Sequence, residues 1–207
     1  MDTEFETEYI KNLEYKHIYE TMMNEFKIQR EKHRYTKDNI QTMAVTIHPH
    51  FTVWLCALQL FKVGGDPMEE NALDEVFGSN KEGSHSQLAL STFKQLGNYR
   101  IEHYERCQSS ISRVYKYVSK ENINVLYAFL ICCEFSNYIF EDLEIAMKEF
   151  GVKDLIYFDV HLSADNHTDG HGVKMLKELE KGKTTMTIQE FNIGIHLYKS
   201  FFLDIFQ

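Results

Sequence analysis

The sequence predicts an all-α, multi-helix bundle, and three observations support this prediction. The 207 residues include only two prolines and ten glycines, so few residues interrupt helices. In most segments apolar residues recur at three- and four-residue steps, which is the spacing of amphipathic helices. No segment alternates between apolar and polar residues as a strand does, and no internal repeat is present. The length is that of one domain, and we expect residues 1–207 to form a single all-helical unit.

The first two expected helices differ in character. Residues 4–32 show an amphipathic pattern, whereas residues 38–62 are apolar nearly all round and should form a central helix that Pro49 kinks or divides. Gly64 and Gly65 then end this helix. Asp66 is placed as an N-cap and Pro67 as the first helical residue, which predicts a short third helix.

The middle of the chain predicts three more helices. Ser84 and Gln87 have the spacing of a capping box, which opens a helix that ends near residue 97. Another helix is expected over residues 99–118. The most hydrophobic helix should cover residues 122–150 and end at a glycine.

The last segments are also helical. A helix is expected over residues 153–166, with a continuation over residues 172–179 after an interruption. Thr187 and Glu190 form a second capping box, which opens an amphipathic C-terminal helix.

Composition and charge exclude several classes of protein and of binding partner. Hydrophobic residues make up 43% of the chain and charged residues 26%, which excludes a disordered chain and a membrane-embedded one. The 22 basic and 31 acidic residues give a net charge of −9, a surface that repels nucleic acid but leaves small anionic substrates possible. We therefore expect a small-molecule substrate, no nucleic-acid partner and no membrane partner, and we keep a homodimer as an option for assembly.

The cysteines and the apolar stretches are consistent with a cytoplasmic location. The start of the chain is acidic and amphipathic, unlike a signal peptide, and the longest apolar stretches, residues 51–61 and 125–133, are shorter than the roughly 18 residues that span a bilayer. No disulfide-framework spacing and no CxxC motif joins the four cysteines, which are Cys56, Cys107, Cys132 and Cys133.

A dense group of histidines and aspartates is the main anomaly of the sequence. His161, His167 and His171 fall within eleven residues, with Asp165 and Asp169 among them. Imidazole and carboxylate together suit iron, manganese or zinc, and a histidine with an aspartate four residues later places both on one helix face. The competing interpretation is a solvated helix end. The apolar, aromatic run before His161 favours the metal-site interpretation, because it predicts that the helical turn of His161 packs against the core.

Isolated acids in apolar helices could supply further ligands. Glu134 interrupts an apolar run, where an unpaired carboxylate would cost several kcal/mol unless it met a cation or took a proton. Alternatively, Glu134 and Glu141 share a solvated stripe of one helix, and this segment alone does not decide between the two interpretations. Glu75 ends another short helix, ten residues before His85.

Together these segments resemble the haem-oxygenase-like diiron oxidases, in the superfamily of haem oxygenase and thiaminase II. The element from Asn71 to Gly78 with His85 resembles the family's N-x-x-x-E-x-x-G motif and its metal histidine, and the helix ending in Glu134 resembles its second core helix. YFDVHLSADNHTDGHG resembles its third element. The resemblance covers about residues 40–179. It implies a haem-oxygenase-like multi-helix bundle and six iron ligands, Glu75, His85, Glu134, His161, Asp165 and His171.

Two ligand positions depart from the family pattern. Many members place the last histidine seven residues after the first; here we prefer His171, because Gly170 can host a break that restores the geometry, with His167 as the alternative. Glu82 has E-x-x-H spacing to His85 and could replace Glu75. Asp169 and Glu141 remain further alternates.

The resemblance implies a nonhaem oxidoreductase that uses two Fe(II) ions and O2 to oxidise a small organic substrate, such as an amino acid or a fatty acid. The outcome could be desaturation, hydroxylation, C–C cleavage or N-oxygenation. A metal-free, thiaminase II-like hydrolase is the alternative, for which residues 132–134 and Glu190 would matter. A helical binding protein without catalysis is the third possibility.

Overall fold

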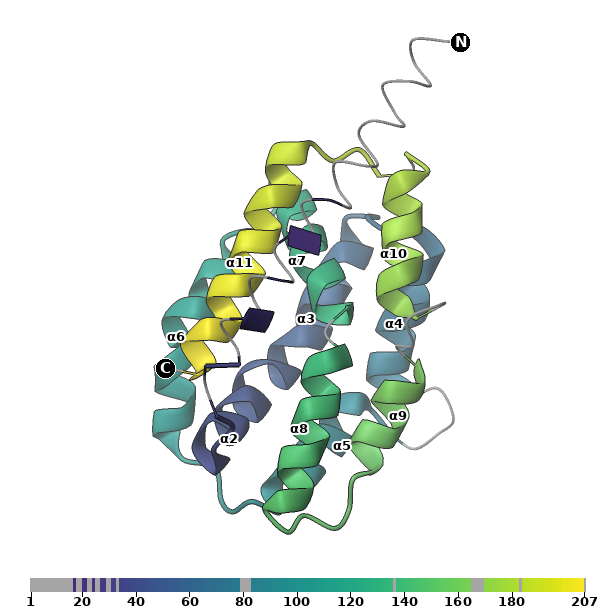
Figure 1. Ribbon diagram of the computed structural model, residues 1–207. Coiled ribbons are helices and arrows are strands. Elements are labelled where there is room, and N and C mark those ends of the chain that lie inside the picture. Colours follow the sequence, from purple (N-terminus) through teal and green to yellow (C-terminus); the bar gives the residue numbers. More distant parts are fainter. Residues whose placement is uncertain are drawn as a thin grey trace.

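The computed structural model describes residues 34–78, 83–135, 137–164, 170–182 and 184–206, together with scattered positions between 17 and 32. Every regular element in these residues is an α-helix, so the all-α prediction is confirmed. In chain order the helices are α2 (Lys37–Thr46), α3 (His48–Leu60), α4 (Gly65–Phe77), α5 (His85–Lys94), α6 (Ile101–Tyr115), α7 (Ile123–Glu134), α8 (Asn137–Glu149), α9 (Ile156–Ala164), α10 (His171–Glu180) and α11 (Ile188–Phe206) (Figure 1). The helix expected over residues 4–32 lies mostly outside the described residues.

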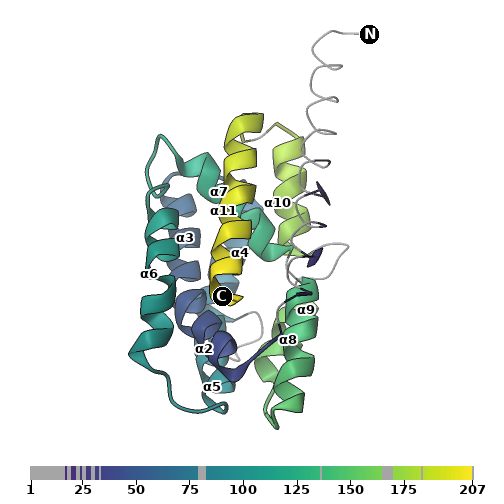
Figure 2. The same ribbon diagram turned by 60° about the vertical axis from the view of Figure 1, so that its left-hand side comes forward.

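Helix α7 is the centre of the bundle because it is apolar nearly all round and almost wholly buried. Helix α11 packs along α7, α6 packs on α11, and α3 and α10 pack on α7. Figures 1 and 2 show α8 and α9 side by side at the lower end of the molecule, with α10 above α9. The helices thus bury one shared hydrophobic core.

The helix ends follow local signals at several positions. The break between α2 and α3 falls at Ile47, and Pro49 lies in the first turn of α3, so the predicted division at this proline is confirmed. The Ser84 hydroxyl accepts a hydrogen bond from the Gln87 amide at 3.2 Å and caps α5, as predicted. The box at the start of α11 is also confirmed: the Glu190 amide donates to Thr187 Oγ1, and the Thr187 amide donates to Glu190 Oε2.

The predicted start of the third helix is wrong. Helix α4 begins at Gly65, so Asp66 lies inside its first turn rather than at the cap. Gly64 is the cap, with φ of +93°, and a Cβ there would lie 2.9 Å from the ring of Tyr127. The chain turns here because glycine allows both the left-handed backbone and the close approach to α7.

Two expectations about apolar helices also need correction. The helix predicted over 122–150 is divided into α7 and α8, and its two parts, Ile123–Glu134 and Ile139–Glu149, are bent by 51°. In the described residues no single helix is both long and apolar enough to cross a membrane, and this bent pair reaches that length only when its parts are counted together. The segment 38–62, which was expected to be central, is not buried on every side, because Val53 and Leu60 of α3 are exposed.

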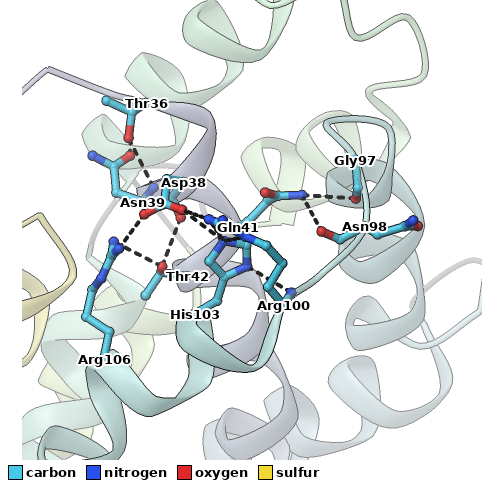
Figure 3. A network of polar contacts seen from close by, with 10 residues as sticks. All are labelled: Thr36, Asp38, Asn39, Gln41, Thr42, Gly97, Asn98, Arg100, His103 and Arg106. Atoms are coloured by element: carbon cyan, nitrogen blue, oxygen red, sulfur yellow. Dashed lines mark hydrogen bonds and ion pairs between the residues drawn. The ribbon is translucent and has the colours of Figure 1, made fainter.

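A polar network joins α2 to α6 at the outside of the bundle (Figure 3). The carboxylate of Asp38 accepts hydrogen bonds from Arg100 and Arg106, and it lies 3.0 Å from Nε2 of the fully buried His103. The hydrogen bond from Arg106 holds the pKa of Asp38 below its usual value, with a further contribution from His103. This network links the two helices through polar groups and lies apart from the cavity described below.

Candidate metal centre

Three buried donors meet where α4, α5 and α9 converge. Glu75 lies near the end of α4, His85 is the first residue of α5, and His161 lies in the last turn of α9. One ligand atom from each lies within 4.8 Å of the others. The three residues are far apart in sequence, so the packing of the three helices creates this group.

Local structure sets the positions of Glu75 and His85. The Ser84 cap begins α5 so that His85 is its first residue, and α4 packs against α5. His85 Nδ1 lies 2.8 Å from Glu75 Oε1, a hydrogen-bonding distance. The Nε2 edge of the His85 ring is therefore the one directed away from this carboxylate oxygen.

Aromatic rings surround the side chain of His161. Its ring centroid lies 4.7 Å from that of Phe140, 4.9 Å from that of Tyr157 and 5.2 Å from that of His85. Tyr157 precedes His161 by one helical turn of α9, so the two side chains share a face. These contacts limit the rotamers that His161 can adopt and direct its ring toward Glu75 and His85.

A second group of polar residues gathers around Glu134 at the end of α7. The amide of Asn71 donates a hydrogen bond to Glu134 Oε1 at 2.6 Å. His171, the first residue of α10, places Nδ1 3.9 Å from Glu134 Oε2 and Nε2 3.4 Å from Asp74 Oδ2. Glu134 and His171 are both buried. Helices α4, α7 and α10 thus bring one amide, two carboxylates and one imidazole together.

Gly172 permits the close approach of α10 to α7 in this second group. A Cβ at this position would lie 3.0 Å from both Glu134 Cβ and Phe135 Cδ2, closer than ordinary side-chain contacts. The absence of a side chain therefore lets His171 reach the carboxylate of Glu134.

One cavity of about 30 Å³ adjoins both groups. Glu75 and His161 from the first group and Glu134 from the second group line it. The lining also contains residues from α2, α3, α8 and α11. The two groups are therefore neighbours across a shared interior space.

His48 and Tyr157 form a buried pair at this cavity. Tyr157 Oη lies 3.2 Å from His48 Nε2. Burial lowers the pKa of His48 to about 3, with smaller electrostatic contributions from His161 and His85, so its imidazole is neutral near pH 7. His48 is the first residue of α3 and lines the cavity.

The structure describes five of the six predicted ligands. Glu75, His85 and His161 form the three-donor group, and Glu134 and His171 form the neighbouring group. The sixth ligand, Asp165, lies outside the described residues, as do the alternates Glu82, His167 and Asp169. The break expected before His171 is present at Gly170, whose extended backbone directly precedes α10.

The solvated-stripe interpretation of Glu134 is wrong. Glu134 is 6% exposed, and Glu141 is exposed on a different helix, α8. The bend between α7 and α8 separates the two acids. The sequence did not predict Asp74 as a member of this polar group. Asp74 directly precedes Glu75 in the same motif, but nothing local distinguishes it from the other acids of α4.

The thiols that a hydrolase would need are poorly placed for nucleophilic chemistry. Burial raises the pKa of both Cys132 and Cys133, and for Cys133 the neighbouring Cys132 and Glu134 raise it further. A thiolate is disfavoured in such a setting. Glu190 caps α11 and accepts a hydrogen bond from Asn124, and it does not line the cavity.

The donor set is compatible with divalent iron, manganese or zinc. Carboxylate oxygen and imidazole nitrogen suit these ions, and a thiolate-rich or all-oxygen site would favour others. The buried carboxylates also favour a cation, because an uncompensated charge in the interior is costly. Among the described residues, Glu75, His85 and His161 are the group whose spacing could hold one ion. Glu134 and His171 offer the same types of donor beside it.

Known proteins add no further information on this site, since no family model and no curated protein matches the sequence.

Proposed function

We propose that this protein is a nonhaem diiron enzyme of the haem-oxygenase-like type, which uses O2 to oxidise a small organic substrate. The observation that carries the proposal is the convergence of two donor groups on one interior cavity. Glu75, His85 and His161 form the first group, and Glu134 with His171 forms the second. These are five of the six residues that the family resemblance implies.

Each donor group has a separate role in the proposal. Glu75, His85 and His161 would hold one ion, and Glu134 and His171, with Asp165 on sequence grounds, would hold the second. Two Fe(II) ions would supply the electrons and the open coordination positions that dioxygen chemistry needs. The chain provides the orientation: Asn71 donates to Glu134 and limits the rotation of its carboxylate.

The surroundings of the two groups suit oxidative chemistry. Glu75, Glu134 and His161 are all buried, so bulk water has little access to the donors. Exclusion of water protects reactive species from side reactions and strengthens electrostatic interactions inside the site. The raised pKa values of Cys132 and Cys133 favour this function over a thiol-dependent hydrolase.

Anaerobic Fe(II) titration followed by metal analysis tests the proposal. We expect two Fe(II) ions per wild-type chain, and His161→Ala and Glu134→Ala should each lose bound iron because each removes a donor from a different group. Glu141→Ala and His196→Ala are matched controls, because both residues are exposed and should leave the iron content unchanged. Wild-type protein that retains no iron would contradict the proposal.

A further inference from the structure

We propose that Asp74 is a positioning residue for His171. Its carboxylate accepts a hydrogen bond from Nε2–H of His171, so that the unprotonated Nδ1 is directed toward Glu134 and toward the second ion. The place of this proton is a property of the metal-free chain. Its consequence for metal binding rests on the proposed function.

Two polar pairs join α4 to α10 in one register. His171 Nε2 lies 3.4 Å from Asp74 Oδ2, and Lys174 Nζ lies 2.9 Å from both carboxylate oxygens of Glu70. Glu70 precedes Asp74 by one turn of α4, and Lys174 follows His171 by one turn of α10. The packing of the two helices therefore sets the position of the His171 ring relative to Asp74.

Both nitrogens of the His171 ring face a carboxylate. Nε2 lies 3.4 Å from Asp74 Oδ2, and Nδ1 lies 3.9 Å from Glu134 Oε2. A neutral imidazole carries one proton, and the nitrogen without the proton is the one that can bind a metal ion. The tautomer thus decides which of the two carboxylates shares an ion with His171.

The two distances favour the proton at Nε2. The separation of Nε2 from Asp74 exceeds an ordinary hydrogen bond by only about 0.2 Å, whereas the separation of Nδ1 from Glu134 is clearly too long for one. Two donors of one ion, each about 2.1 Å from it, lie roughly 3–4 Å apart. The spacing of Nδ1 and Glu134 therefore suits a shared ion, and the shorter contact is the one that can close to a hydrogen bond.

The burial of the two carboxylates supports the same assignment. The Asp74 side chain is 23% exposed, so water can solvate its carboxylate, whereas the Glu134 side chain is 4% exposed. A buried carboxylate is costly unless a cation or hydrogen bonds compensate it. Asn71 supplies a hydrogen bond to Glu134 Oε1, and an ion would compensate the remaining charge. Asp74 is thus the hydrogen-bond acceptor, and Glu134 is the ligand of the ion.

A carboxylate behind a metal-binding histidine has a general effect on that ligand. It holds the ring in one orientation, fixes the tautomer and makes the opposite nitrogen a stronger donor to the metal. Asp74 would act on the second ion in this way, through His171, and would not itself touch the ion.

The tautomer of His171 in the metal-free, full-length chain tests the first part of the proposal. Long-range 1H–15N NMR at about pH 8, where an ordinary imidazole is neutral, shows which ring nitrogen carries the proton, and His171→Gln assigns the signals. We expect Nε2–H in the wild type. In Asp74→Ala the proton should move toward Nδ1, because the Glu134 carboxylate then faces the ring without competition from Asp74. Nδ1–H in the wild type, or an unchanged tautomer in Asp74→Ala, would overturn the proposal.

Glu70→Ala is the matched control. It removes the other polar pair between α4 and α10, the one with Lys174, and leaves Asp74 in place, so it should keep the wild-type tautomer. The same change of tautomer in both variants would mean that Asp74 only docks α10, which contradicts the proposal. If Asp74→Ala does not fold, Asp74→Ser replaces it, since serine is uncharged and shorter.

Anaerobic Fe(II) titration tests the part that rests on the diiron function. Asp74→Ala should weaken binding of the second ion by about 10–100-fold and leave the first ion unchanged, whereas Glu70→Ala should keep both affinities. Two equally tight ions in Asp74→Ala and in the wild type would refute the role of Asp74 alone. Wild-type protein without bound iron would refute the diiron function, and the NMR result would still decide the place of the proton.

Discussion

The state of single ionisable side chains depends on the packing around them. His48 is held neutral because it is buried next to Tyr157 and faces the imidazoles of His85 and His161. In the unfolded chain the same histidine has an ordinary pKa near 6.5. Folding therefore changes its proton affinity, and this difference links stability to pH.

We expect the stability of the metal-free protein to fall as the pH drops below about 6.5, in part through His48. The folded state resists protonation of His48 down to a pKa of about 3, whereas the unfolded state takes the proton near 6.5. Between pH 7.5 and pH 5 this difference removes about 2 kcal/mol from the free energy of unfolding. Urea denaturation of the wild type and of His48→Gln at both pH values measures it.

The variant should lose less stability than the wild type over this pH range. His196→Gln changes an exposed histidine and should follow the wild-type pH dependence. Equal losses in the wild type and in His48→Gln would show that His48 is solvated in the folded state.

The family resemblance, together with residue types, selected most of the candidate donors. Glu134, His161 and His171 stood out because acids and histidines are conspicuous beside apolar or aromatic runs, whereas Glu75 and His85 were selected through the resemblance. Asp74 could not be selected in this way. Its approach to His171 depends on the packing of α4 against α10, which no local pattern reports.

At the scale of elements, the contact between α7 and α11 holds the centre of the bundle. Gly194 of α11 lies against α7 so closely that a Cβ there would be 2.5 Å from Ala128 Cβ and 2.6 Å from the carbonyl oxygen of Val125. The oxygen belongs to the backbone, so rotation of a side chain cannot relieve the overlap. A larger residue would have to push the two helices apart.

Gly194→Ala should therefore destabilise the protein by about 1–3 kcal/mol, as overpacking of a core does. Thermal and urea denaturation measure this loss. Asn192→Ala, on the exposed face of α11, is the matched control and should stay within about 0.5 kcal/mol of the wild type. Adding Ala128→Gly to Gly194→Ala should recover only part of the loss, because the overlap with the backbone remains; a fully stable single variant would contradict this packing.

Most helices could be predicted as elements, but one division could not. The break at Pro49 and the caps at Ser84 and Thr187 follow local chemistry, so the sequence indicated them. The end of α7 at Glu134 has no proline or glycine to mark it. Here α10 packs against Glu134 and Phe135 through Gly172, a tertiary contact that lies at the bend.

At the scale of the whole molecule, the candidate centre joins helices from all parts of the bundle. Its donors come from α4, α5, α7, α9 and α10. The unfolded chain cannot bring these side chains together, so an ion that they bind must favour the folded state. Glu75 and Glu134 are also buried, and a cation would compensate their charge.

We expect Fe(II) to raise the unfolding temperature of the metal-free protein under anaerobic conditions. At a free ion concentration of about 100 times Kd, the stabilisation is about 2.7 kcal/mol. Differential scanning calorimetry measures the shift, and a chelator should reverse it. Mg²⁺ should have little effect, because it prefers an all-oxygen, octahedral site.

The variant His161→Ala separates ion binding from general salt effects. It should show a much smaller Fe(II)-dependent shift than the wild type, whereas His196→Ala should keep the full shift. Equal shifts in all three proteins would place the ion elsewhere in the chain.

By itself the sequence determined the helical class, several of the helix ends and a set of candidate donors, because periodicity, caps and residue chemistry act over a few neighbouring positions. The tertiary structure alone decided which donors share a space. It brought Glu75, His85 and His161 within reach of one another, paired Glu134 with Asn71 and His171, and left Glu141 exposed. These relations depend on the angles and distances between helices that are remote in sequence, and such distances follow from the packing of the whole core.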